Sequence, residues 1–467
     1  MIVHAGPTDA SSGLTIGVAT DSLGNVTSSD PAPRSPTELL QRLIRFNTVN
    51  PPGNEREANE FLAGLLEEAG FAVTLVGNTP ERPNLVAELR ADDPSAAAAG
   101  PVLGLLSHVD TVLAAPEDWQ HDPWSGDLVE GEIWGRGAID MKSQTAAEVW
   151  AALELARSGW RPARGSLKVF VVVDEETGGS EGAVWICANH PDLARCDLLL
   201  NEGGGAPLTF RGQRHYGICT GEKGPLRFAL HADGTAAHAA TPRLGDNALV
   251  RLAPLITRLA EAELPFDIDP SIAAMLDGLG LDASDPAAAY AALREEAPAL
   301  SAAIEPMGRI TFSPNIVSAG DKINVIPDRA ELRVDCRVPP NLTTEQAQQR
   351  ILDALAPLPH GVTVAWGMTV PGNHSPAEGP LFDALRDWLA EHAPEAGIVP
   401  TFLPGFTDSR TWREAFPDCI AYGFFPHRNL ELGEQAGRMH AKNERIDVED
   451  LDFATRCFRD VTVEILG

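Results

Sequence analysis

Cysteine is scarce in this chain of 467 residues and follows no disulfide pattern. The six cysteines are scattered from Cys187 to Cys457, and no Cys-x-x-Cys pair occurs. This density is far too low for a disulfide scaffold. We therefore expect reduced, buried thiols in a cytoplasmic protein.

Basic residues and long apolar runs are also lacking. Lysine and arginine number 36 against 66 aspartates and glutamates, which gives a net charge of −30. This charge argues against nucleic acid and anionic membranes as partners. No apolar run approaches the ~20 residues of a membrane-spanning helix. The remaining expectation is an acidic, solvated surface in which some carboxylates could bind metal ions.

The first 34 residues are rich in Ser, Thr, Gly, Asp and Pro. They have no basic start followed by an apolar core, so they do not have the pattern of a secretory signal peptide. We interpret residues 1–34 as a flexible extension, or as the product of a start codon placed too early.

The next part of the chain alternates helices and strands. Helices are expected at 36–46, 55–69, 141–158 and 180–189, and strands at 71–76, 84–89, 102–106, 166–173 and 198–201. The segments 92–100 and 111–138 are expected to be loops. Strands that alternate with helices indicate a mostly parallel sheet with helices on both faces. The expected fold class is α/β.

The pattern changes near Thr220. Residues 220–370 contain the signals of two helices on an antiparallel sheet, a small α+β module, and within it 263–307 is an Ala- and Pro-rich, helical insertion. After Pro371 the earlier pattern returns. We therefore expect one domain built from 35–219 and 371–467, interrupted by an inserted module.

Five separate segments supply candidate metal ligands and catalytic groups. They are His108 with Asp110, Asp140, the pair Glu175 and Glu176, Glu202, and His440. Each of them has a structural alternative when taken singly: a hydrogen-bonded strand end, a helix N-cap before Met141, a charged turn, or a solvated loop. Together, two imidazoles and several carboxylates from distant loops suit a pair of divalent ions, of which zinc or cobalt accepts both ligand types.

In chain order, these segments resemble metallopeptidase family twenty. That family includes carboxypeptidase G, acetylornithine deacetylase, succinyl-diaminopimelate desuccinylase, aminoacylase and carboxypeptidase S. The resemblance extends from about Ser35 to Gly467 and rests on five segments. They are Leu-Leu-Ser-His-Val-Asp at 105–110, Gly-Arg-Gly-Ala-Ile-Asp-Met-Lys-Ser at 135–143, Glu-Glu at 175–176, Asn-Glu-Gly-Gly-Gly at 201–205 and Arg-Met-His-Ala-Lys-Asn-Glu at 438–444. It implies a zinc-exopeptidase-like catalytic domain with an inserted ferredoxin-like dimerisation or lid domain.

The resemblance also implies a role for each candidate. Asp140 would bridge two ions and precede a cis peptide bond, Asp110 would orient His108, and Glu175 would be the general base. The remaining ligands would be His108, Glu176, Glu202 and His440. The ions would most simply be zinc, which cobalt could replace.

Further roles are implied for the lid and for one loop of the large domain. His238, in Ala-His-Ala-Ala-Thr-Pro at 237–242, would reach the active site of the partner in a homodimer and hold the oxyanion; alternatively it is a turn histidine. Asn324 would contact substrate, whereas Arg337 is interpreted as structural. Arg410 is a candidate clamp for a substrate carboxylate, although its segment could equally serve as a helix cap.

These roles predict hydrolysis of the amide bond in a small N-acyl amino acid or a short peptide with a free carboxylate. One alternative is a carbamoyl-amino-acid or allantoate-type amidohydrolase, but that branch typically carries histidine where this chain has Glu202. The other alternative is an inactive, metal-binding dimer, which the presence of every expected ligand and of the base disfavours.

Overall fold

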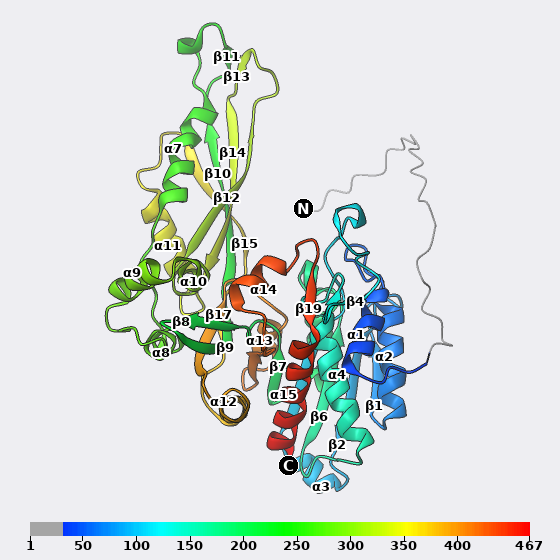
Figure 1. Cartoon of the computed structure of the whole chain (residues 1–467). Helices are drawn as coiled ribbons and strands as arrows, with labels where there is room; N and C mark the ends of the chain where they lie inside the picture. Colours follow the sequence, from blue (N-terminus) through cyan, green and yellow to red (C-terminus); the bar gives the residue numbers. More distant parts are fainter. Residues whose placement is uncertain (1–30) are drawn as a thin grey trace, which may run out of the picture. The chain divides into compact units, whose positions relative to one another are not determined.

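The computed structural model describes residues 31–467. Residues 1–30 of the predicted extension therefore lie outside the described part. The described chain forms a ten-stranded sheet with flanking helices and a separate four-stranded sheet with two helices of its own (Figure 1). None of the described helices is both long enough and apolar enough to cross a membrane.

The large sheet has a parallel centre and antiparallel edges. The central strands β6, β3, β7 and β18 are neighbours in that order and run parallel, whereas the pairs at both ends are mostly antiparallel. The strands are β1 (Ala72–Val76), β2 (Asn84–Arg90), β3 (Val102–His108), β6 (Ser166–Val172), β7 (Leu198–Asn201), β8 (Pro207–Phe210), β9 (Gln213–Glu222), β16 (Asn373–His374), β17 (Gly397–Leu403) and β18 (Ile420–Gly423). Parallel central strands place their carboxyl ends at one edge, where α/β folds build their sites.

Side chains of the central strands alternate between the two faces of this sheet, and they are buried on both faces. Leu106, Phe170 and Leu199 face one side, where Ile186 and Trp412 from two helices complete an apolar cluster. Helices α4 and α15 pack together against β3 and β6. The helices of this part are α1 (Pro36–Arg45), α2 (Arg56–Glu68), α4 (Lys142–Arg157), α5 (Ala183–Asn189), α6 (Pro191–Ala194), α12 (Pro380–His392), α13 (Ser409–Ala415), α14 (Leu432–Arg438) and α15 (Val448–Leu466). The predicted α/β class is confirmed.

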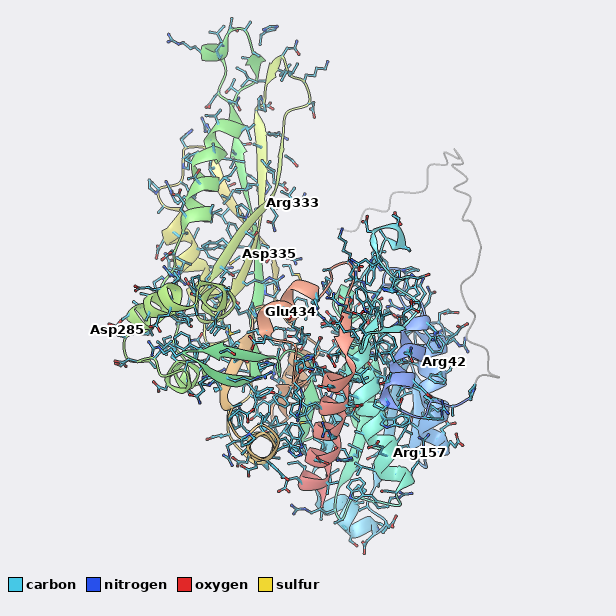
Figure 2. All side chains as sticks on the ribbon, in the orientation of Figure 1. Arg42, Arg157, Asp285, Arg333, Asp335 and Glu434 are labelled. Carbon is cyan, nitrogen blue, oxygen red and sulfur yellow. The ribbon has the colours of Figure 1, made fainter. Side chains whose placement is uncertain are left out.

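The small sheet follows the predicted α+β pattern. Its strand order is β12-β14-β10-β15, all antiparallel, and the chain order β-α-β-β-α-β is that of a ferredoxin-like module. The elements are β10 (Gly224–Asp233), α7 (Ala248–Glu261), β12 (Thr311–Ala319), β14 (Arg329–Val338), α11 (Thr344–Leu355) and β15 (Val362–Thr369). Leu332 and Val334 pack under the helices, whereas the alternate residues Arg333 and Asp335 lie on the open face (Figure 2).

The insertion is helical, as predicted, and it packs on the large sheet. It contains α8 (Pro270–Gly278), α9 (Pro286–Glu296), α10 (Pro298–Ile304) and the short η4 (Glu305–Gly308). Apolar residues of these helices form one buried cluster with Leu208, Phe210, Val399 and Phe402 of β8 and β17. The insertion therefore adds a helical layer to the antiparallel edge of the large sheet.

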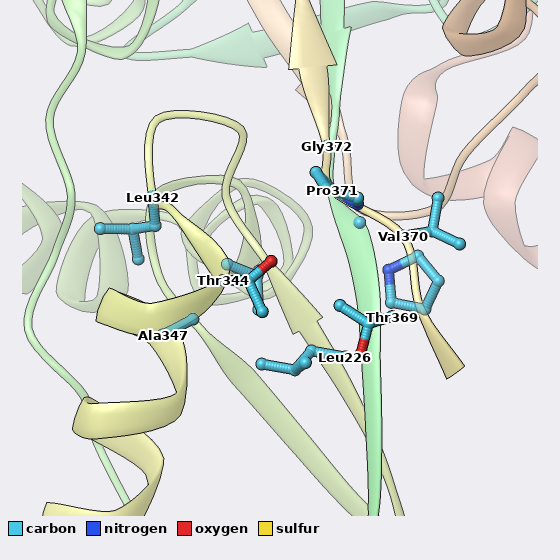
Figure 3. Close-up of a pocket in the computed structure, with 11 residues that line it drawn as sticks. Leu226, Leu342, Thr344, Ala347, Thr369, Val370, Pro371 and Gly372 are labelled. Carbon is cyan, nitrogen blue, oxygen red and sulfur yellow. The ribbon is translucent and has the colours of Figure 1, made fainter. Parts of the chain in front are cut away.

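Two segments join the small sheet to the large one, and they pass close to each other. Lys223 separates β9 from β10, and the chain returns through 370–372 (Figure 3). A Cβ atom on Gly224 would lie 2.0 Å from the Val370 carbonyl oxygen, and one on Gly372 would lie 2.4 Å from the Glu222 carbonyl oxygen. Only glycine permits backbones this close.

One segment predicted to be a loop contains a helix instead. Helix α3 (Pro94–Ala99) occupies most of 92–100. The Asp93 carboxylate caps it by accepting the N–H groups of Ser95 and Ala96. A proline at the first helical position followed by alanines also favours a helix. The loop prediction for this segment is wrong.

The other predicted loop, 111–138, contains short regular elements. They are η1 (Pro116–Asp118), β4 (Asp127–Val129) and β5 (Glu132–Trp134), and β5 also pairs with β19 (Arg445–Asp447). Three-residue strands are too short to produce a recognisable alternation of apolar and polar residues. The pairing with β19 brings the segment that follows His440 next to the segment that leads to Asp140.

Candidate metal centre

His108 lies at the end of the central strand β3, and its two ring nitrogens face different carboxylates. Its side chain is 1% exposed. Nδ1 lies 3.0 Å from the Asp110 carbonyl oxygen and 3.4 Å from Asp110 Oδ1. Nε2 points the other way, 3.2 Å from Asp140 Oδ1. Asp110 therefore orients the ring and leaves Nε2 available as a metal ligand.

Asp140 faces both histidines of the predicted ligand set. Its Oδ1 lies 3.2 Å from His108 Nε2, and its Oδ2 lies 2.9 Å from His440 Nε2. The peptide bond between Asp140 and Met141 is cis, as predicted. A carboxylate whose two oxygens point to two different imidazoles has the arrangement required of a ligand that bridges two ions.

Glu175 and Glu176 form a turn that Asp110 holds by its backbone. They begin η2 (Glu175–Thr177), which Val173 and Asp174 separate from the end of β6. The Glu175 N–H donates to Asp110 Oδ1 and the Glu176 N–H to Asp110 Oδ2, both at 3.2 Å. Glu175 Oε2 lies 3.9 Å from His108 Nε2, whereas Glu176 Oε2 lies 3.3 Å from His440 Nε2. The adjacent carboxylates therefore turn toward different histidines.

Glu202 and His440 complete the cluster from two further loops. Glu202 follows β7, and its Oε1 lies 3.7 Å from His108 Nε2. His440 follows α14 with a positive φ of 57° and is half exposed. Two overlapping groups within the cluster have ligand atoms close enough to hold one ion each: His108, Asp140 and Glu176, and His108, Glu175 and Glu202.

Buried carboxylates crowd one another in this cluster. Burial raises the pKa of Glu175 and of Glu202, and their nearest carboxylates raise each pKa further. Burial would also raise the pKa of Asp140, but hydrogen bonds from His108 and His440 lower it below its usual range. Hydrogen bonds to Asp140 and Glu176 raise the pKa of His440 to about 10. Carboxylates this crowded are stabilised by protons or by cations.

The donor set fits divalent cations. Within residues 31–467, Glu176 Oε1 is buried and has no hydrogen-bond partner. A buried carboxylate oxygen without a partner is costly unless a cation binds it. Imidazole nitrogens and carboxylate oxygens together favour zinc or a similar ion over calcium or magnesium. The site can therefore hold metal ions, with Asp140 between the two histidines.

Sequence reasoning did not single out two side chains that support the 174–176 turn. The Asn50 amide donates to Asp110 Oδ2 at 2.9 Å and to Asp174 Oδ1 at 3.1 Å, which joins the two carboxylates. Asp174 adopts a left-handed conformation with a φ of 69° and also accepts from Thr177 Oγ1 and Ser180 Oγ. Asp174 could have been found by its place beside Glu175, but nothing local to Asn50 indicates its role.

Replacing Asp174 with asparagine is expected to destabilise the protein in a pH-dependent way. Burial alone would raise the pKa of Asp174, but hydrogen bonds from Thr177, the Glu181 amide, Asn50 and Ser180 lower it to about 2. A pKa lowered by folding stabilises the protein above the unfolded value, near 4, and this stabilisation is lost as the pH falls toward 2. We expect a loss of about 2 kcal/mol in unfolding free energy near neutral pH.

This expectation is measured by urea unfolding of wild type and Asp174→Asn between pH 7 and pH 3. The difference should be constant above about pH 5 and shrink below about pH 4. The exposed Asp192 provides a control substitution, Asp192→Asn, with no comparable effect. A difference that grows on acidification would contradict the assignment.

Three predicted residues lie outside the cluster of ligands. His238 and Asn324 belong to the small module, where β11 (Ala237–His238) pairs with β13 (Val325–Ile326) and the Ala239 N–H donates to the Asn324 carbonyl. Arg410 donates to Glu414 Oε2 and to the Pro371 carbonyl. In the described chain, no hydrogen bond or ion pair connects these three residues to the ligand cluster.

Lys142, interpreted from the sequence as structural or solvated, is structural. It is fully buried, and its ammonium group donates to the carbonyls of Leu43 and Phe46 at 3.0 and 2.7 Å. Burial lowers its pKa to about 7. These bonds join the start of α4, two residues after Asp140, to the end of α1.

Comparison with known sequences identifies the same ligand-bearing region. The profile of peptidase family M20/M25/M40 matches residues 104–464. Succinyl-diaminopimelate desuccinylase from Methylobacterium sp. (strain 4-46) is 29% identical over 452 residues, covering 92% of this chain and 96% of that protein. A probable succinyl-diaminopimelate desuccinylase from Staphylococcus aureus (strain MRSA252) is 24% identical, covering 92% and 97%.

Solved structures support the fold. A metallo-carboxypeptidase of the M20 family from Sulfolobus solfataricus superposes with a TM-score of 0.68 at 17% identity, covering 91% of this chain and 98% of that one. Human carnosine dipeptidase 1 superposes with a TM-score of 0.65 at 14% identity, covering 92% and 96%. At these identities, the similarity establishes a shared fold and not a shared substrate.

Proposed function

Because the chain belongs to peptidase family M20/M25/M40 and is therefore a hydrolase of amide bonds, we propose that it is a dinuclear, zinc-dependent enzyme. Its substrate is a small N-acyl amino acid or a short peptide that carries a free carboxylate. The observation that carries the proposal is the position of Asp140, with one oxygen 3.2 Å from His108 and the other 2.9 Å from His440.

The candidate ligands form two sets that would each hold one ion. His108 and Glu202 would hold one ion, Glu176 and His440 would hold the other, and Asp140 would be shared by both. When bound, such ions polarise an amide carbonyl and lower the pKa of a water molecule to near neutrality. Asp110 keeps the His108 ring in the required orientation.

Glu175 is proposed as the general base. Among the described residues, no hydrogen bond engages its carboxylate, so the carboxylate is free to take a proton from the attacking water. Burial raises its pKa, which favours acceptance of that proton. The protonated carboxyl would then donate the proton to the leaving amine. Asp110 fixes the backbone of this turn and so limits where the carboxylate can lie.

The acyl substrate is inferred from the relatives and from the predicted contacts. The desuccinylases named above act, by their names, on succinyl-diaminopimelate. Asn324 and Arg410 are proposed to contact the carbonyl or carboxylate of the substrate. In a single chain, Arg410 is held by Glu414 and the Pro371 carbonyl, so it would have to exchange these partners for substrate.

A substrate screen tests the proposed function. Protein loaded with zinc or cobalt is assayed with succinyl-diaminopimelate, a panel of N-acyl amino acids, dipeptides and N-carbamoyl amino acids. We expect release of a free amine from one of the first three classes and no turnover by protein treated with a chelator. Exclusive turnover of N-carbamoyl amino acids would favour the alternative reaction, and no turnover of any amide would favour the inactive dimer.

We further propose that two chains form a homodimer through the inserted domain, residues 220–370. Strand β12 is an edge strand, with Ile316 and Val317 exposed on it. On and near α7, Leu244 is 77% exposed and Val250 is 64% exposed. Open strand edges that expose large apolar side chains are typical of surfaces that bind another chain. His238, exposed on β11, would then enter the active site of the partner.

Complementation between variants tests this shared site. His238→Ala and Glu175→Gln are each expected to be nearly inactive. A mixed dimer would contain one site with both native residues, so an equilibrated equal mixture should recover about a quarter of wild-type activity, because half the dimers are mixed and one of two sites is intact. The assay is turnover after mixing, with dimer content measured by analytical ultracentrifugation. Failure of a dimeric mixture to recover activity would exclude a shared site.

A further inference from the structure

Glu444 is a fully buried carboxylate that takes no part in the mechanism above, yet it contacts the loop that carries Asp140. Its side chain is 0% exposed. Oε1 accepts the N–H groups of Ile139 at 2.6 Å and of Asp140 at 3.0 Å. Oε2 accepts Arg136 Nη1 at 2.6 Å and the Gly137 N–H at 3.2 Å. Each oxygen therefore receives two donors from one short loop.

This pattern of donors requires an ionised carboxylate at position 444. A carboxylate offers about four acceptor positions and no donor, and four donors surround Glu444. A glutamine would have to direct its NH2 group toward one of those donor pairs. The glutamine NH2 group would then face N–H donors of the loop in a buried place. Neither the NH2 group nor those donors would have an acceptor, so their hydrogen bonds would be lost.

The same residue also fixes the loop that carries His440. The Gly135 N–H donates to the Glu444 carbonyl at 3.0 Å, and Arg136 Nη2 reaches the His440 carbonyl at 3.5 Å. His440 and Asn443 have positive φ values of 57° and 62°. Residues other than glycine rarely adopt this backbone conformation unless the surrounding structure holds them in it. Glu444 therefore links the loop of Asp140 to the loop of His440. The side chains of these two residues meet, with His440 Nε2 2.9 Å from Asp140 Oδ2.

We propose that Glu444 is a positioning residue for the metal pair, which holds the Asp140 and His440 loops together so that the ion between Asp140, Glu176 and His440 can bind. The inference rests on the proposed dinuclear function. The other ion would also use Asp140, but its two further ligands are anchored elsewhere: His108 ends β3 and Glu202 follows β7. Loss of the Glu444 carboxylate should thus weaken one ion more than the other.

The test is calorimetric titration of metal-free protein with zinc chloride, with cobalt absorption spectra as a second readout. Wild type is expected to bind two ions per chain. Glu444→Gln is expected to bind the first ion nearly as wild type does and the second roughly 10- to 100-fold more weakly, the usual cost of losing support behind a ligand. The altered cobalt spectrum would report a change at one ion only.

Asp450 provides a matched control. It is also a buried carboxylate, and it accepts the backbone N–H groups of Arg428, Asn429 and Leu430, away from the ligand loops. Asp450→Asn should lower the unfolding temperature while leaving both zinc affinities unchanged. If Asp450→Asn also weakens one ion selectively, the effect of Glu444→Gln reflects general destabilisation and the proposal is overturned.

A conservative variant covers the case in which Glu444→Gln does not fold. Glu444→Asp keeps the charge, but its shorter side chain can reach only one of the two donor pairs, so we expect a smaller weakening of the same ion. Wild-type affinity for both ions in a folded Glu444→Asp or Glu444→Gln variant overturns the role of Glu444. Absence of zinc binding by wild type would instead overturn the proposed function, so the two failures are distinguishable.

Discussion

Glu175→Gln is expected to lower kcat by about 10²- to 10⁴-fold, the usual contribution of a general base, and to leave both ions bound. The amide retains the size of the side chain but cannot accept the proton of the attacking water. KM should change little, because the carboxylate is proposed to act on water and not on the substrate. The measurements are steady-state kinetics on the best substrate of the screen and metal content by mass spectrometry.

This variant also distinguishes between two possible roles of Glu175, general base and metal ligand. Glu175 Oε2 is 3.9 Å from His108 Nε2 and, with Glu202, belongs to a group that could hold an ion. If Glu175→Gln loses one ion together with its activity, Glu175 is a ligand and the base must be another residue. Glu117→Gln, at an exposed position in η1, is the control and should behave as wild type.

Asp140→Asn is expected to abolish binding of both ions at concentrations that saturate wild type. Each carboxylate oxygen faces a different histidine, and an amide keeps only one oxygen and carries no charge. Activity should fall at least as far as in Glu175→Gln, since no ion remains to activate water. Metal content and turnover, measured on the same preparation, check this result.

A thermal readout strengthens the same experiment. A ligand present at 1,000 times its Kd stabilises a protein by about 4 kcal/mol, so adding zinc should raise the unfolding temperature of metal-free wild type by several degrees and leave Asp140→Asn unchanged. Asp118→Asn, at an exposed position, should respond to zinc as wild type does. Retention of two tightly bound ions by Asp140→Asn would remove the basis for a bridging carboxylate.

Local sequence patterns predicted most of the regular elements because apolar periodicity and caps act over a few residues. The α/β class and the antiparallel α+β sheet followed from such patterns, whereas the packing of α8, α9 and α10 on the large sheet did not. The helix within 92–100 could have been predicted from local sequence, since Asp93 followed by proline and alanines is itself a helix-start signal. The three-residue strands of 111–138 could not, because strand β5 is paired with the distant strand β19.

By itself, the sequence determined which chemical groups the site contains: two histidines and several carboxylates, at strand ends and in the order of a known family. Only the tertiary structure decided which groups meet. The sheet order β6-β3-β7 brings Glu175 and Glu202 to either side of His108, although the chain order differs. It also decided that Asp140 faces both histidines and that Glu444 holds their loops together. Periodicity encodes local shape, whereas distances between residues some 300 positions apart follow from strand order and loop packing.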